Sequence, residues 1–296
     1  MMKNGIKSGR VSVSDNVEIE DFKQWTQQAV LDVRCVEAFQ QCHLVNSYNI
    51  PLAEIHERIY ELPRRDKPLL VIVDPSEKNQ LILTLNAITY KLYKCLTITE
   101  LQWQKLQQRQ LTETGKSFSY LWEPNFLLRE SLETLGEKVT GRQALDLACG
   151  SGRDAVYLAL QQWQVTAIDY QSSHLDKVEQ LAKRLETSIS TQCLNLESDK
   201  LPLWNASFDL IIVMRYLHRP LWPRLKAWLK PGGALIMQTF LEGAEKFGKP
   251  KNPRYLLKEH ELNRTFSGYH IERDTCDYLE DGRPVNSFVA IKRNLL

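Results

Sequence analysis

The stretch that decides the fold of the second half of the chain is Leu145–Ala155, which reads LDLACGSGRDA. It places a G-x-G-x-x-A run, beginning at Gly150, between a segment typical of a buried strand and a segment typical of a helix. Glycines at such a turn let the backbone approach a ligand closely and direct helix N–H groups toward it. The run alone fits a dinucleotide or another nucleotide-containing cofactor.

Two aspartates near this run narrow the choice. Asp146 lies four residues before Gly150, where a carboxylate would repel a pyrophosphate but favour a cationic ligand. S-adenosyl-L-methionine carries a sulfonium and an ammonium group, so Asp146 favours it over a nicotinamide dinucleotide. Asp169 ends the segment VTAID and could accept both hydroxyls of an adenosine ribose. Both cofactors contain such a ribose, so Asp169 does not separate them.

Strand-like and helix-like segments alternate after Gly141, in the order QALDLA, RDAVYLALQQW, VTAID, FDLIIVM and ALIMQTF. This alternation predicts an α/β fold with a mostly parallel, doubly wound sheet of the Rossmann-like type. The chain closes with YHIERDTCDYLE and VNSFVAIKR on either side of DGRP, and DG is a strong signal for a tight turn. We therefore predict a terminal antiparallel hairpin on that sheet.

The segments LDLACGSGRDA, AID, FDLIIVMRYLHR and LKPGG together resemble a class I S-adenosylmethionine-dependent methyltransferase over residues 116–296. SYLWEPNFLL, RYLHRPLWP and QTF are most similar to small-molecule methyltransferases of the tellurite-resistance type. The resemblance implies a methionine-binding loop, a ribose contact at Asp169 and an adenine contact at Asn195 and Leu196. Asn195 stands where an Asp is common in such proteins. The cofactor-binding residues that the resemblance implies are Asp146, Ala148, Gly150, Gly152, Asp169, Asn195, Leu196 and Met214.

The acceptor is expected beside the residues that follow FDLIIV, since ligands of open α/β sheets lie outside the carboxyl ends of the strands. Arg215 could hold an anionic acceptor and His218 could take a proton from it. The alternative is that both side chains brace the next helix. Tyr120 and Trp122 precede the core and could contact the substrate or form a lid, or they could pack between domains.

The first part of the chain predicts a separate small α/β domain. The segments LDVR, EAF, HL, NIPL and LLVIVD, in that order, resemble a rhodanese homology domain over residues 15–112, and we expect the domain boundary near Glu113 to Lys116. Rhodaneses place a sulfur-carrying cysteine directly after the strand that reads LLVIV here, but this chain has Asp74. An aspartate cannot carry a persulfide, so the domain is expected to dock a protein partner, regulate the enzyme or serve a structural role. The helical pattern of Leu52, Ile55, Ile59 and Leu62 predicts a helix that packs on its sheet.

Composition excludes several classes of protein. The 296 residues carry 38 Lys+Arg and 36 Asp+Glu, without the basic excess of a general nucleic-acid binder. The six cysteines form no C-x-x-C pair and no metal-ligand spacing, which suits a reducing compartment without a zinc site. No run approaches the ~18 apolar residues that would span a bilayer. We therefore predict a cytoplasmic protein that acts on a small molecule and uses no metal.

Three functions remain open at this level. The leading hypothesis is S-adenosyl-L-methionine-dependent methyl transfer to a small acceptor that is anionic or a soft nucleophile. The second is a regulatory or sensor protein that binds the cofactor without catalysis. The third, a nicotinamide oxidoreductase, is disfavoured by Asp146 and by KPGG followed by a terminal hairpin.

Overall fold

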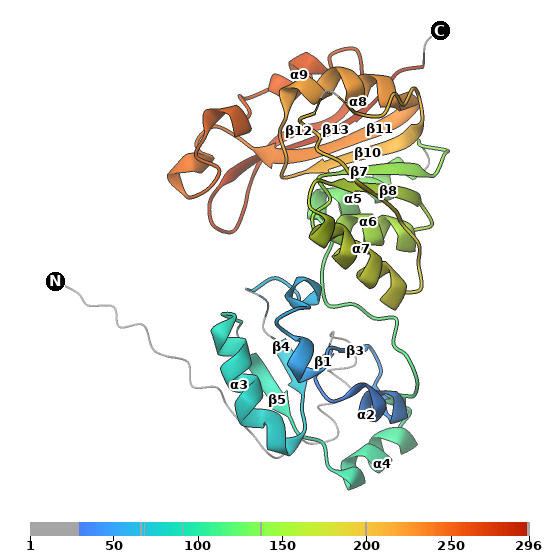
Figure 1. The fold of residues 1–296 in the computed structure, drawn as a ribbon, viewed down its shortest axis with the longest axis vertical. Helices are drawn as coiled ribbons and strands as arrows, with labels where there is room; N and C mark the ends of the chain where they lie inside the picture. The colour runs from blue at the N-terminus through green and yellow to red at the C-terminus, as the bar shows by residue number, and fades with distance from the viewer. Residues whose placement is uncertain are drawn as a thin grey trace, which may run out of the picture. The chain divides into compact units, whose positions relative to one another are not determined.

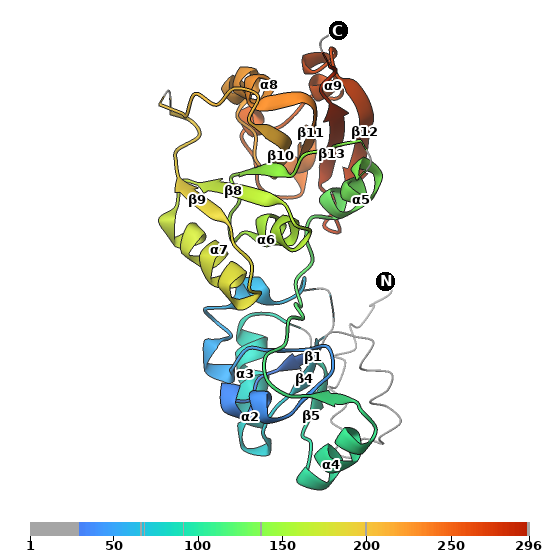
Figure 2. The ribbon, with the colours of Figure 1, turned by 90° about the vertical axis from the view of Figure 1, so that its right-hand side faces the viewer.

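The chain divides into two compact units, Met1–Glu123 and Pro124–Leu296. The computed structural model describes residues 30–294, apart from residues 66, 68, 91, 137 and 199. Residues 15–29, the predicted start of the first domain, lie outside the described residues. Figures 1 and 2 draw the two units from perpendicular directions.

The first unit is built on a parallel sheet of four strands in the order β3-β1-β4-β5. These strands are β1 (Val30–Asp32), β3 (Ser47–Asn49), β4 (Leu69–Ile72) and β5 (Leu92–Leu96). Its α-helices are α2 (Val36–Gln41), α3 (Lys78–Ala87) and α4 (Glu100–Gln108). A capping box between Thr99 and Gln102 starts α4, because each side chain satisfies a backbone N–H of the other residue.

The α-helix predicted from Leu52, Ile55, Ile59 and Leu62 does not form, but the prediction that this face packs on the sheet is confirmed. Two short 3-10 helices form instead, Leu52–Glu54 and Ile59–Glu61. Leu52, Ile55 and Leu62 are buried in the core of the first unit. Arg58 lies between the two short helices and donates to Glu54, to Glu61 and to the carbonyl of Asn49. These contacts hold the segment on the sheet without a continuous α-helix.

The first unit extends further along the chain than the predicted boundary near Glu113 to Lys116. β6 (Thr112–Glu113) pairs antiparallel with β2 (His43–Leu44), and the amide of Gly115 donates to the carbonyl of Gln40 at 2.7 Å. Leu121 packs in the core of this unit. Pairing and packing between residues distant in sequence set this boundary, and local composition does not record them.

The second unit is a sheet of seven strands in the order β12-β13-β11-β10-β7-β8-β9. Its strands are β7 (Gln143–Leu147), β8 (Gln164–Asp169), β9 (Ser190–Cys193), β10 (Phe208–Met214), β11 (Leu229–Phe240), β12 (His270–Tyr278) and β13 (Pro284–Ile291). Neighbouring strands from β9 to β11 pair in parallel, and β13 pairs antiparallel with both β11 and β12. The terminal hairpin therefore forms as predicted. The strand order reverses at β7, which lies between β8 and β10.

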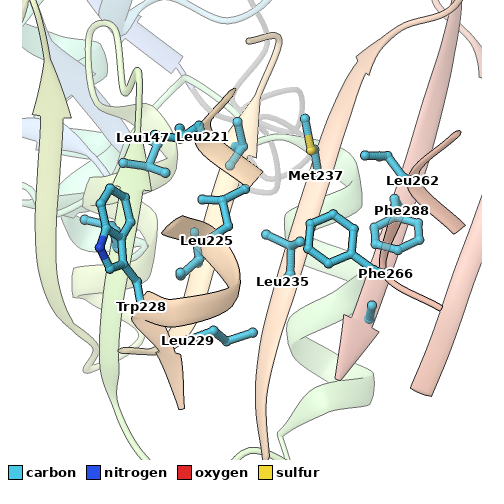
Figure 3. Packing of buried hydrophobic residues seen from close by; sticks show 14 of the residues in the cluster. Leu147, Leu221, Leu225, Trp228, Leu229, Leu235, Met237, Leu262, Phe266 and Phe288 are labelled. Carbon is cyan, nitrogen blue, oxygen red and sulfur yellow. The ribbon is translucent and has the colours of Figure 1, made fainter. Parts of the chain in front are cut away.

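Helices cover both faces of this sheet, as expected for a doubly wound fold (Figure 1). They are α5 (Phe126–Leu135), α6 (Arg153–Leu160), α7 (Ser172–Arg184), α8 (Trp222–Trp228) and α9 (Glu261–Thr265). Alternate strand residues point to opposite faces. Leu145 and Leu147 pack in a cluster with residues of α8 and α9, whereas Ala144 packs with residues of α5 and α6. Figure 3 shows the first cluster, which includes Trp228 and Leu225 of α8, Leu262 of α9 and Phe266, the residue after α9.

The turn from β7 into α6 depends on a close approach at Gly152. Gly152 is the N-cap of α6 and has a φ of 79°. A Cβ built on Gly152 would lie 2.5 Å from Cγ2 of Val178 on α7. Gly150 also has a positive φ, 55°, but a Cβ there would meet no atom within 4 Å.

We expect Gly152→Ala to lower the free energy of unfolding by about 2–4 kcal/mol, because it adds a side-chain clash to the strain of a left-handed residue. Gly150→Ala should cost about 1 kcal/mol, because it adds the strain alone. Urea unfolding of the full chain measures both. Equal losses in the two variants would show that the approach of Val178 does not limit this turn.

Candidate active site

The glycine loop is tied to the neighbouring strand β8 by hydrogen bonds. The amide of Cys149 donates to the carbonyl of Ile168 at 2.9 Å, and the amide of Gly150 donates to Oδ2 of Asp169 at 2.9 Å. Ala148 has a φ of 56°, so three of the five residues from Ala148 to Gly152 have left-handed backbone. Burial and the charges of Asp146 and Asp169 raise the pKa of the Cys149 thiol, which disfavours the nucleophilic thiolate.

Asp146 lies near the carboxyl end of β7 and is 2% exposed. Its Oδ2 atom is buried and makes no hydrogen bond with any residue that the structure describes. Burial, together with the charges of Asp154 and Asp169, raises the pKa of Asp146 well above its ordinary value, although the amide of Ala155 donates to it. A buried carboxylate of this kind is stabilised by a cationic partner. The orphaned oxygen therefore fits the ammonium group of the predicted cofactor.

Asp169 ends β8 and is buried. Its Oδ1 accepts a hydrogen bond from the amide of Gln171 at 3.0 Å, while Oδ2 accepts from Gly150. Nδ1 of His174, on α7, lies 3.2 Å from Oδ1. An ionised carboxylate has about four acceptor positions, so these contacts leave capacity for a ribose hydroxyl.

The other predicted cofactor residues follow β9 and end β10. Leu196 is buried, whereas Asn195 is exposed and its Oδ1 accepts from the amide of Glu197 at 2.9 Å. The preceding amide, that of Leu194, donates to the carbonyl of Asp169 at 3.0 Å, which places this loop beside the end of β8. Met214, the last residue of β10, is half-buried.

Arg215 and His218 follow β10 directly. Arg215 is exposed and has a φ of 60°, which is an unusual backbone conformation for a residue other than glycine. Its amide donates to the carbonyl of Gln238 at 2.6 Å, its Nε donates to Oε1 of Gln238 at 3.2 Å, and its guanidinium carbon lies 5.5 Å from the ring centre of Phe240. His218 is half-buried, and its ring makes no hydrogen bond with the residues described in the structure.

Tyr120 and Trp122 belong to the first unit. Their rings stack with centres 4.6 Å apart, and Trp122 is 1% exposed. Their role in substrate binding or as a lid stays a prediction.

Four residues that sequence reasoning did not select complete the site: Asn125, Asp154, His174 and Gln238. Asp154, in the first turn of α6, accepts a hydrogen bond from the amide of Asn125 at 2.6 Å. Burial raises the pKa of Asp154 to about 6, although that hydrogen bond and the charges of Arg153 and Arg215 oppose the shift. Asp154 stands in the glycine run itself, so its position was a usable signal. The other three are recognised only by their contacts.

No group of three or more His, Cys, Asp or Glu side chains that could hold a metal ion occurs within the described part of the chain. Nor does any helix among the described residues have the length and apolar character needed to cross a membrane.

Comparisons with known proteins found one matching family model and several similar proteins. Residues 144–233 match a family model described as a methyltransferase domain. The uncharacterized protein UNK4.09 of Schizosaccharomyces pombe is 24% identical over 88% of this chain and 93% of its own length. Phosphoethanolamine N-methyltransferase 1 of Triticum aestivum is 29% identical over 52% of this chain, and the match spans 33% of that enzyme. The crystal structure of TehB from Haemophilus influenzae aligns with 56% of this chain and 61% of its own, with 17% identity and a TM-score of 0.47.

The second unit therefore carries a class I methyltransferase domain. The protein is an S-adenosyl-L-methionine-dependent methyltransferase, and the enzyme class and cofactor predicted from the sequence are confirmed.

The raised pKa of Asp154 predicts a specific dependence of stability on pH. Because its folded-state pKa, about 6, exceeds the ordinary value of 3.8, the folded protein binds this proton more tightly than the unfolded chain does. Its contribution to stability is present below about pH 4 and is lost as the pH rises toward 6; a shift of about two pKa units corresponds to about 3 kcal/mol. Asp154→Asn keeps an acceptor for the Asn125 amide and removes the charge, so this loss should disappear.

Urea unfolding of both proteins between pH 4 and pH 7 measures the difference. Asp176→Asn, which removes an exposed carboxylate on α7, is the control. A wild-type and Asp154→Asn difference that stays constant over this range would contradict the assignment.

Proposed function

We propose that this enzyme transfers a methyl group to a small acceptor that is anionic or a soft nucleophile, and that Arg215 holds the acceptor. The observation that carries the proposal is the position of Arg215, an exposed residue that directly follows the carboxyl end of β10. β10 is the direct neighbour of β7, which leads into the glycine loop. Ligands of doubly wound sheets lie at this edge, beside the point where the strand order reverses.

The cofactor fits the residues around that loop. In this proposal Asp146 pairs with its ammonium group, the loop residues Ala148, Gly150 and Gly152 lie around its methionine portion, and Asp169 accepts from its ribose. Leu196 packs beside the adenine, Asn195 lies at its edge, and Met214 lies near the transferable methyl group. When bound, S-adenosyl-L-methionine supplies an electrophilic methyl carbon on a positively charged sulfur.

The protein contributes mainly positioning to such a transfer. Arg215 would hold the acceptor so that its attacking atom faces the methyl group of the bound cofactor. Holding two reactants in this alignment removes much of the entropic cost of the step. His218 accepts a proton only when the acceptor carries one, since a thiolate or an oxyanion can attack without a base.

Two further observations support an anionic acceptor. The guanidinium of Arg283, which pairs with Asp281 at 2.8 Å, lies 4.7 Å from the ring centre of Phe240, the same ring that Arg215 covers. The wheat relative is named for phosphoethanolamine, a small phosphorylated amine.

We propose that the first unit is a rhodanese-like module without sulfurtransferase activity that binds a protein partner. The parallel order β3-β1-β4-β5 supports this assignment. Asp74, after β4, precedes the 3-10 helix Pro75–Glu77 and makes no side-chain capping hydrogen bond to it. A carboxylate at this position opposes an anionic persulfide.

Arg215→Ala should lower kcat/KM for the acceptor about tenfold or more, the scale of a lost charged hydrogen bond of about 1.5–3 kcal/mol, while the Kd for S-adenosylhomocysteine changes little. His218→Ala should lower kcat for acceptors that must lose a proton and leave turnover of acceptors that are already anionic unchanged. Formation of S-adenosylhomocysteine is measured with thiols, oxyanions, halides and small carboxylates as candidate acceptors. Calorimetry gives the Kd for S-adenosylhomocysteine. Cofactor binding without turnover on any acceptor would favour a sensor, and unchanged turnover in both variants would remove Arg215 and His218 from the site.

The full chain should show no thiosulfate:cyanide sulfurtransferase activity, because Asp74 occupies the position of the sulfur carrier. Thiocyanate formation measures this activity, and Asp74→Cys serves as the gain-of-function comparison. Robust turnover that survives removal of Cys35, Cys42 and Cys95 would refute the proposed role of the first unit.

A further inference from the structure

Gln238 is a buried polar residue near the carboxyl end of β11, and both polar atoms of its side chain form hydrogen bonds. It lies on β11, is 3% exposed and pairs in register with Met214 of β10 and Ser287 of β13. Its Oε1 accepts from Nε of Arg215 at 3.2 Å and from Nδ2 of Asn125 at 3.0 Å. Its Nε2 donates to Oγ of Ser287 at 2.9 Å.

These partners determine which way the amide points. A guanidinium has only donors, so the group facing Arg215 must be the amide oxygen. Nε2 then faces Ser287, whose hydroxyl can accept. Rotating the amide by 180° would set its NH2 group against the Nε–H of Arg215, so the orientation is held by its partners.

Gln238 also holds the backbone of Arg215. The backbone amide of Arg215, the first residue after β10, donates to the Gln238 carbonyl at 2.6 Å, and Arg215 has a φ of 60°. A residue other than glycine in this conformation costs on the order of 1 kcal/mol and persists only where its surroundings hold it. One residue therefore fixes both the main chain and the guanidinium of Arg215.

The same contacts connect Arg215 to the cofactor loop. Asn125 caps α5 through its Oδ1, which accepts from the amide of Leu127 at 2.8 Å. The backbone amide of Asn125 donates to Oδ1 of Asp154 in the first turn of α6. A continuous network thus runs from Arg215 through Gln238 and Asn125 to the helix that follows the glycine loop.

The chemistry of an amide decides what this contact does to Arg215. Gln238 takes one of the five N–H donors of the guanidinium and adds no negative charge. A glutamate of the same shape would bind the same Nε–H and cancel the cation. Phe240, two residues along β11, adds an aromatic face to Arg215 without adding charge either.

We propose that Gln238 is the positioning residue of the acceptor site, which orients Arg215 through an uncharged contact and so favours acceptors that carry an anionic group. This inference rests on the proposed function, because it assumes that Arg215 meets the acceptor. It extends that function by assigning selection for a charged acceptor to a buried neutral side chain on β11.

The test follows the Nε–H signal of Arg215 in the nitrogen-15 NMR spectrum of the full chain with bound S-adenosylhomocysteine. The signal is assigned by its loss in Arg215→Lys. The probe is 2-mercaptoethanesulfonate, a small anionic thiol, and 2-mercaptoethanol is its neutral counterpart. We expect the sulfonate to shift this signal in the wild type and the neutral thiol to leave it in place.

Gln238→Glu should raise the Kd for 2-mercaptoethanesulfonate, measured from the shift of the Arg215 signal, at least tenfold. Gln238→Leu should speed exchange of the Arg215 Nε–H with water at least tenfold. Gln180→Glu, the same change at an exposed site on α7, should behave as the wild type. In turnover, the preference in kcat/KM for the anionic over the neutral thiol should fall at least tenfold in Gln238→Glu, through KM, with the cofactor Kd unchanged within about twofold.

The outcomes separate this inference from the proposed function. If the sulfonate leaves the Arg215 signal unmoved in the wild type, Arg215 does not hold an anion and the proposed function fails. If the sulfonate moves it equally in the wild type and in Gln238→Glu, the proposed function stands and the role of Gln238 is refuted. Unchanged exchange of the Nε–H in Gln238→Leu would also overturn the positioning role, whether or not either thiol is methylated.

Discussion

The hydrogen bond from the Gly150 amide to Asp169 is the contact on which the rest of the site depends. It joins the loop after β7 to the end of β8, so two neighbouring strands present one continuous edge to a ligand. Gly152 allows this geometry because α7 approaches it closely at Val178. The turn, the helix α6 that follows it and the carboxylate of Asp169 are therefore positioned together.

Negative charge gathers at this edge. Asp146, Asp154 and Asp169 lie close enough that the charges of the latter two raise the pKa of Asp146. Burying a carboxylate without a cation lowers the stability of the folded state, and Oδ2 of Asp146 is buried without a hydrogen-bond partner among the described residues. A cationic cofactor offsets it, which gives a physical reason why a sulfonium and ammonium ligand suits a loop that otherwise resembles a dinucleotide site.

Two arginines lie on the other side of β7, near the ends of β10 and β11, and one of them, Arg283, pairs with Asp281. Arg215 and Arg283 lie over the ring of Phe240, and Gln238 orients Arg215 from below the surface. The strand order brings these opposite charges to neighbouring strands of one sheet edge, because β10 pairs directly with β7. An anionic acceptor and a cationic cofactor would thus each meet complementary charge on adjacent strands.

Local patterns in the sequence were sufficient for six of the second unit's seven strands, its doubly wound α/β type and its terminal hairpin, because strand and helix periodicities alternate clearly and DG marks the last turn. The edge strand β9 was not predicted. The cofactor followed from Asp146 and the glycine run, since both lie within one short segment.

The first unit was harder to predict. Burial of Leu52, Ile55 and Leu62 followed from their spacing, but the 3-10 geometry depends on Arg58, which donates to Glu54, to Glu61 and to the carbonyl of Asn49. No local signal in the sequence identifies Gln238, Asn125 or His174. A glutamine in a buried strand only interrupts the apolar pattern, and its role is recognised from its hydrogen-bond partners. Only the tertiary structure brings Asn125, Arg215 and Ser287 to Gln238, since hydrogen bonds between residues far apart in sequence form where the sheet and α5 meet.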